Sequence, residues 1–133
     1  MSNLIEELKN EHKIILGILD EVKTFGISSP SGQEKLLSAK GLLIAHMKKE
    51  DEQYYPALKR AAENNKDLMI MLDYFVKDME DVSKKAMCLF DKYSQGGDEA
   101  DFAGDVTLLY MTLKDRIRTE EKTLFVKFGQ INK

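Results

Sequence analysis

The chain has 133 residues, of which 43% are hydrophobic and 32% are charged, and its formal net charge is −3. This length and composition are typical of one globular domain spanning residues 1–133. The lysines alternate with acidic residues, so the basic stripe that a nucleic-acid partner requires is missing. The apolar runs are far shorter than the ~20 residues of a membrane span, and no secretory signal is visible. We expect a cytoplasmic protein without a nucleic-acid or membrane partner.

Two helices are predicted in the first half of the chain. The first begins near residues 2–3 and ends before Gly26. One face of this helix carries Leu8, His12, Ile15 and Leu19. Ser29-Pro30 and the capping box Ser31-x-x-Glu34 both predict the start of the second helix. Pro56 is expected to kink or shorten this helix. The predicted inward face of the second helix consists of Ala39, Leu42, Leu43, His46, Glu50, Gln53 and Tyr54.

Two further helices are predicted in the second half. Asp67 is expected to cap the third helix, and Gly96-Gly97 to end it. Its apolar stripe consists of Leu72, Phe75, Met79, Val82, Ala86, Leu89 and Tyr93. Asp98 or Asp101 begins the fourth helix. Its inward face carries Val106, Leu109, Leu113, Arg116, Glu120 and Leu124. Because short connections force neighbouring helices to run antiparallel, the sequence predicts an all-α, up-down-up-down four-helix bundle.

The pattern around His46 and Glu50 recurs in the second half of the chain around Arg116 and Glu120. Residues four positions apart lie on one face of a helix, so each pair projects to the same side. The first copy has the nitrogen and oxygen ligands of a metal site. The second copy keeps the carboxylate and has lost the imidazole.

A second repeat surrounds His12. Residues 8–15 match residues 75–82 in an apolar, an acidic and a β-branched position, but Met79 stands where the first copy has His12. The sequence therefore predicts two helical hairpins related by an approximate internal twofold axis. Both histidines belong to the first hairpin.

Carboxylates on an apolar helix face require a cation or a proton, because burying an unpaired charge is costly. Imidazole and carboxylate groups are suitable ligands for first-row divalent metals, and bundle interiors collect such ligands from several helices. The sequence therefore indicates His12, His46 and Glu50 as metal ligands, with Glu120 as a fourth ligand or a bridge.

Arg116 limits how many ions fit. One divalent ion beside two carboxylates and the Arg116 guanidinium leaves a net charge of +1, whereas two ions leave +3, and a guanidinium cannot ligate. We expect at most one ion, on the side of the first two helices, with Arg116 where a second ion would lie. A metal-free network of Arg116, Glu50, Glu120 and one protonated histidine is also neutral, so both interpretations stay open.

In order and spacing, these motifs resemble the hemerythrin-like, or HHE cation-binding, family over nearly the whole chain. The resemblance implies a four-helix bundle around a non-haem di-iron centre, in proteins that bind oxygen, repair iron–sulfur clusters, or sense iron and redox state. Met79 and Arg116 take the places of two family histidines. The positions that match family ligands are His12, His46, Glu50 and Glu120.

Together these features predict a protein that binds at most one metal ion, iron by the resemblance, with other divalent metals open. Its expected role is sensing, iron handling or regulation, because reversible oxygen carriage draws an electron from each of two irons. The alternative is a metal-free interaction module in which Arg116 replaces the metal charge. An enzyme acting on peroxide or a diatomic gas through the mononuclear site ranks third, since the sequence offers no substrate pocket to support it. The single Cys88 is predicted to be a buried, inert thiol.

Overall fold

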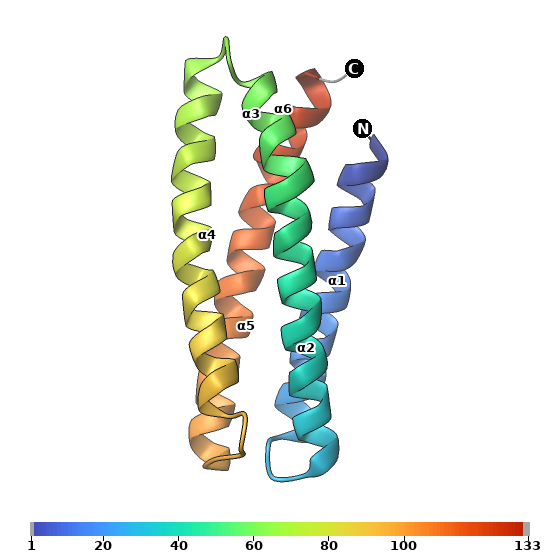
Figure 1. Ribbon diagram of the computed structural model, residues 1–133, viewed down its shortest axis with the longest axis vertical. Helices are drawn as coiled ribbons and strands as arrows, with labels where there is room; N and C mark the ends of the chain where they lie inside the picture. The colour runs from blue at the N-terminus through green and yellow to red at the C-terminus, as the bar shows by residue number, and fades with distance from the viewer. Residues whose placement is uncertain (1, 132–133) are drawn as a thin grey trace.

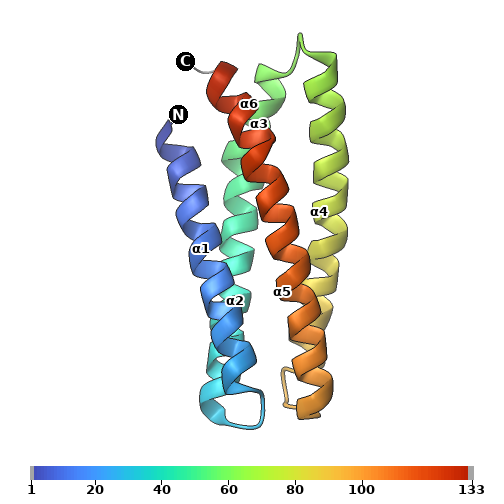
Figure 2. The same ribbon diagram turned by 180° about the vertical axis from the view of Figure 1, so that it is seen from behind.

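The computed structural model describes residues 2–131, which form helices joined by short turns and contain no strand. The helices are α1 (Ser2–Phe25), α2 (Pro30–Lys49), the π-helical turn η1 (Glu50–Tyr54), α3 (Tyr55–Ala61), α4 (Lys66–Lys92), α5 (Glu99–Lys122) and α6 (Leu124–Ile131). The long helices α1, α2, α4 and α5 run antiparallel to their neighbours in the chain, and α1 begins and α6 ends at the same end of the bundle (Figures 1 and 2). The predicted up-down-up-down bundle is confirmed.

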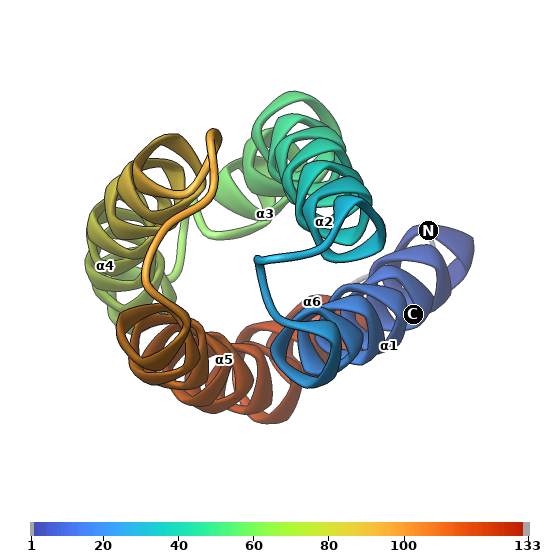
Figure 3. The ribbon, with the colours of Figure 1, turned by 90° about the horizontal axis from the view of Figure 1, so that it is seen from below.

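Viewed along its axis, the bundle places α1, α2, α4 and α5 in a ring (Figure 3). Accordingly, α1 packs against α2 and α5, and α4 packs against the same two helices. The predicted stripes form most of the core, but three inward positions are wrong: Leu42, Gln53 and Arg116, whose side chain reaches α4. Leu42 is 38% exposed, because it lies at the margin of the stripe that Ala39 and Leu43 define. Gln53 is exposed, because the π-helical turn directs Tyr54 into the core instead.

Capping side chains begin three of the helices. Asp98 caps α5, as predicted, and accepts a hydrogen bond from a backbone N–H of the first turn. Of the two predicted start signals of α2, Ser29-Pro30 is the one the helix uses, since Ser29 is the cap and Pro30 the first helical residue. Asn65, and not Asp67, caps α4, which begins earlier than predicted because Asn65 has the extended backbone that a cap requires.

The turn between α1 and α2 is fastened to the start of α5. Gly26 has a φ of +75°, and Gly32 packs so closely that a Cβ there would lie 2.0 Å from the Gly26 carbonyl oxygen. The Glu99 carboxylate accepts hydrogen bonds from the backbone N–H groups of Ser28 and Ile27. Hydrogen bonding from the Ser28 side chain, followed by that from the Ile27 backbone, holds the pKa of Glu99 below its usual value. The first hairpin is therefore tied to the second at this end of the bundle.

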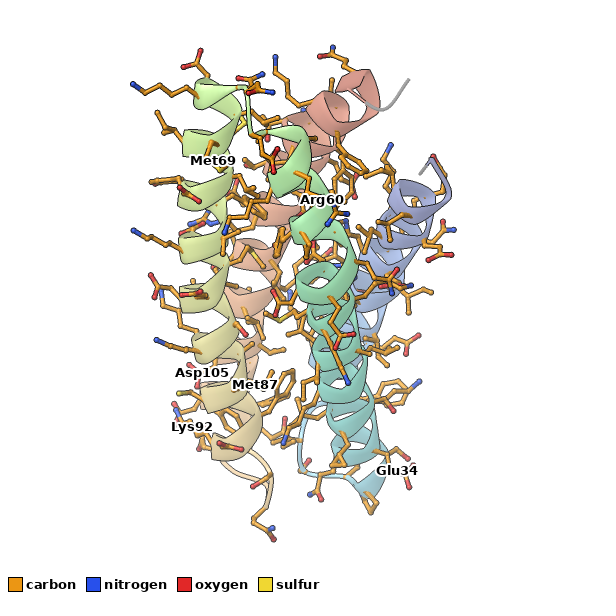
Figure 4. The ribbon with its side chains drawn as sticks, turned by 45° about the horizontal axis from the view of Figure 1, so that its top comes forward. Glu34, Arg60, Met69, Met87, Lys92 and Asp105 are labelled. Atoms are coloured by element: carbon orange, nitrogen blue, oxygen red, sulfur yellow. The ribbon has the colours of Figure 1, made fainter. Side chains whose placement is uncertain are left out.

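The α4–α5 hairpin is closed by a second polar cluster. Figure 4 shows Lys92 and Asp105 at the same end of the bundle, and the Lys92 Nζ lies 2.9 Å from the Asp105 Oδ2. The Tyr93 hydroxyl donates to the same carboxylate over 2.5 Å. Nearby, Cys88 is exposed, and the prediction of a buried thiol is wrong, because Cys88 lies off the stripe that Leu89 continues. In the described residues, we find no helix with the length and apolarity of a membrane span.

Candidate metal centre

Four polar side chains meet in the otherwise apolar interior. They are His12 on α1, His46 on α2, Glu50 at the start of η1 and Glu120 on α5, and each is at most 5% exposed. His12 Nε2 lies 3.2 Å from Glu120 Oε1, and His46 Nε2 lies 3.2 Å from Glu50 Oε1. The centroids of the two imidazole rings are 4.7 Å apart. The structure thus brings together all four residues for which the sequence predicts metal ligation.

The π-helical turn follows directly from Pro56. Proline has no N–H to continue an α-helical ladder, and its ring clashes with the preceding turn. The helix therefore widens, and the backbone N–H of Tyr55 bonds to the carbonyl of Glu50. The predicted disturbance by Pro56 is confirmed. Glu50 begins the turn at the metal centre, and at its end Tyr54 packs edge-on against Phe125, with ring centroids 5.2 Å apart.

Ligand atoms of His12, His46 and Glu50 all lie within 4.8 Å of one another, which is close enough to hold one ion. The Oε2 atoms of Glu50 and Glu120 are buried without a hydrogen-bond partner among the described residues. A cavity of about 10 Å³, the scale of a single small occupant, is lined by all four residues. Unpaired buried carboxylate oxygens are costly, and a cation removes this cost. The donor set, the unpartnered oxygens and the cavity fit one metal ion.

The two buried carboxyl groups differ in their affinity for protons. Burial raises the pKa of Glu120 well above its usual range, and the charge of Glu50 raises it further. Burial acts in the same direction on Glu50, but its contact with the His46 imidazole outweighs burial and lowers the pKa of Glu50. Of the two carboxyl groups, Glu120 therefore has the higher affinity for a proton.

The two histidines also differ. Burial lowers the pKa of His12, and repulsion from His46 lowers it further. Burial also disfavours the charged form of His46, but its contacts with Glu50 and Glu11 outweigh this and raise the pKa of His46. Because metal ligation requires deprotonated groups, a metal ion would compete with protons for these side chains.

Each histidine is held from behind by a carboxylate that the sequence did not identify. His12 Nδ1 lies 2.7 Å from Glu121 Oε2, and His46 Nδ1 lies 2.8 Å from Glu11 Oε1. An Nδ1–H that donates to these carboxylates leaves Nε2, the atom facing Glu120 or Glu50, available to ligate. An acidic residue next to a candidate ligand could have identified them from the sequence, because Glu11 precedes His12 and Glu121 follows Glu120. In both cases the acid serves a histidine on another helix.

Arg116 has partners other than those expected. Its Nε atom contacts Asp78 on α4, and its Nη1 atom lies 2.7 Å from Asp115 Oδ2. Within the described part of the chain, Arg116 forms no ion pair with Glu50 or Glu120, and its side chain is 32% exposed. The interior network of Arg116 with the two glutamates is therefore not what the structure shows. Arg116 turns to α4 because an acid closer to the surface is available there.

The Arg116 contact preserves the internal repeat. Asp78 corresponds to Glu11 in the sequence repeat, and its contact with Arg116 corresponds to the contact between Glu11 and His46. Met79, the counterpart of His12, is 9% exposed and lines the central cavity. A thioether, and not a guanidinium, therefore occupies the interior of the half that has lost its histidines.

A family model described as the hemerythrin HHE cation binding domain matches residues 3–128. Comparisons with curated proteins and with solved structures gave no significant match. The match extends from α1 into α6 and includes all four buried polar residues of the centre. The chain therefore belongs to the hemerythrin HHE cation-binding domain family.

Proposed function

We propose that the protein binds a single iron ion through His12, His46 and Glu50, with Glu120 as a further ligand, and that it senses or handles this ion. Two imidazoles and one carboxylate form the donor set of many mononuclear non-haem Fe(II) sites. The single observation that carries the proposal is the convergence of these three side chains on a cavity in which two carboxylate oxygens have no hydrogen-bond partner from residues 2–131.

The loss of both histidines in the second hairpin argues for one ion rather than two. Met79 offers only a weak thioether donor, and Arg116 is fixed by Asp78 as a cation that cannot ligate. Neither residue can replace an imidazole. A di-iron oxygen carrier needs both halves, so we propose sensing, iron handling or regulation instead.

The chain's own residues prepare the centre for an ion. Glu121 and Glu11 hold the two imidazoles through their Nδ1 atoms, and Lys49 holds Glu11 in turn over 2.5 Å. Phe125 lies parallel to the His12 ring, with the ring centroids 5.7 Å apart, and covers it. When bound, an iron ion supplies Lewis acidity and one-electron redox chemistry.

The test is metal analysis of protein loaded with Fe(II) under anaerobic conditions and then freed of excess metal. We expect about one ion per chain, with losses of about tenfold or more in affinity for Glu50→Gln and His46→Ala. Glu52→Gln is the matched control, because Glu52 is an exposed carboxylate two positions away. Less than about 0.2 ion per chain, unchanged by Glu50→Gln, refutes the proposal and favours the metal-free interaction module.

A further inference from the structure

A second cavity, of about 270 Å³, adjoins the metal centre on the side of α4. It lies between α4 and the segment formed by α2 and η1. Three of its lining residues, Met47, Glu50 and Met79, also line the central cavity. The two spaces are therefore neighbours, separated by little more than these side chains. Typical sites for drug-sized ligands have volumes of about 300–1,000 Å³, so this cavity suits a small molecule.

The second cavity exists where the second half of the family's centre has been lost. Met79 takes the place of a histidine, and among the described residues Glu50 forms no hydrogen bond with it. Methionine is unbranched and flexible, so its side chain can move aside at low cost. Ser83, one turn further along α4, donates a weak hydrogen bond to Met47 Sδ over 3.4 Å and holds the opposite wall.

The other described sides of the centre are packed with side chains. Phe125 covers His12, and the Tyr54 ring, which is fully buried, packs against Phe125. On the Nδ1 side of His46, Glu11 contacts the imidazole and forms an ion pair with Lys49. A molecule that approaches the ion from α4 avoids all of these contacts.

The outer rim of the second cavity is acidic. Asp51 and Glu80 are exposed carboxylates on opposite walls, one on η1 and one on α4, and Lys84 is the single cation among the lining residues. The buried Glu50 adds a third carboxyl group at the inner end. Charge of one sign in a cleft raises or lowers the local concentration of charged ligands. This rim therefore disfavours anions.

We propose that the α4-side cavity is the route by which a small, uncharged ligand reaches the metal ion, with Met79 at its inner end and with Asp51 and Glu80 selecting against anions. The proposal rests on the proposed function, because it assigns a ligand class to the same centre. The inner end of this route is Met79, at a position where family members that keep both pairs of histidines have a histidine.

The first experiment uses the metal-free protein and the methionines as reporters. Hydrogen peroxide, which is uncharged, and peroxomonosulfate, an anion, each transfer one oxygen atom to a thioether and leave water or sulfate. Mass spectrometry gives the oxidation rate of Met79 relative to that of Met111, which is 62% exposed and serves as the internal reference. We expect this ratio to be at least about threefold lower with the anion than with peroxide. The double variant Asp51→Asn/Glu80→Gln should remove the difference, whereas Asp81→Asn, at an exposed neighbouring position, should leave it.

Equal ratios with both oxidants, or a difference that persists in the double variant, overturn the proposal. This result is independent of metal content and therefore separates a failure of the route from a failure of the proposed function. Replacing the buried Met79 side chain with a small one risks unfolding the protein. The second experiment therefore uses Met79→Leu, which keeps an apolar side chain of similar size.

In the iron-loaded protein, Met79→Leu should slow the association of nitric oxide at least about twofold, because the branched side chain is less mobile than methionine. Met69→Leu on the same helix is the control, since Met69 does not line the cavity. Full metal binding with an unchanged association rate in Met79→Leu counts against Met79 as the inner end of the route.

Discussion

Replacing Glu121 with alanine should weaken metal binding without unfolding the bundle. Glu121 contacts His12 Nδ1 over 2.7 Å and has no role as a ligand in our proposal. Its loss frees the His12 ring to rotate and removes the acceptor that keeps the proton on Nδ1. The proton can then move to Nε2, and a protonated Nε2 cannot ligate the ion.

The magnitude follows from the exposure of the carboxylate. A hydrogen bond to a charged group contributes about 1.5–3 kcal/mol, and the 32% exposure of the Glu121 side chain reduces this through solvent screening. We expect a loss of about 1–2 kcal/mol, which corresponds to an increase of about five- to thirtyfold in the dissociation constant. Glu121→Gln keeps an acceptor oxygen and loses the charge, so its effect should be smaller, at about threefold.

The assay is competition with a chromophoric chelator, together with thermal unfolding of the metal-free variants. Lys122→Ala is the control, because Lys122 is exposed and occupies the next position on the helix. The orienting role is refuted by unchanged affinity in Glu121→Ala. It is equally refuted by a loss of affinity matched by a large fall in the melting temperature of the metal-free protein, which indicates a structural role.

Three further predictions concern the lost half, the turn and pH. Met79→His combined with Arg116→His should raise the metal content from about one to about two ions per chain, since both missing imidazoles return, and elemental analysis reads this directly. Gly32→Ala should lower stability by about 1–3 kcal/mol in denaturant titration, because its Cβ would lie 2.0 Å from a backbone oxygen, whereas Gly41→Ala, with open space around it, should be neutral or stabilising. The lowered pKa of Glu99 contributes stability that is fully present above the unfolded-state pKa and is lost as pH falls through the folded-state pKa, so the Glu99→Gln variant should lose less stability on acidification than the parent protein.

Much of the centre was predictable because it depends on local periodicity. Hydrophobic spacing placed His12, His46, Glu50 and Glu120 on inward helix faces, and all four are buried. The chemistry of imidazole and carboxylate then indicated a cation. Arg116 lies on the same predicted face, but the pattern could not show that its long side chain reaches Asp78 on α4.

The sequence by itself determined the four-helix architecture, the caps to within two residues, and the donors that face the interior, since helical period and turn residues act over a few positions. Only the tertiary structure decided which carboxylate holds each imidazole, because Glu121 lies 109 positions from His12 and Glu11 lies 35 positions from His46. It also created the cavity beside Met79, since a space between helices depends on how side chains from distant segments pack. The set of buried donors therefore arises from local pattern, and the orientation of its imidazoles arises from long-range packing.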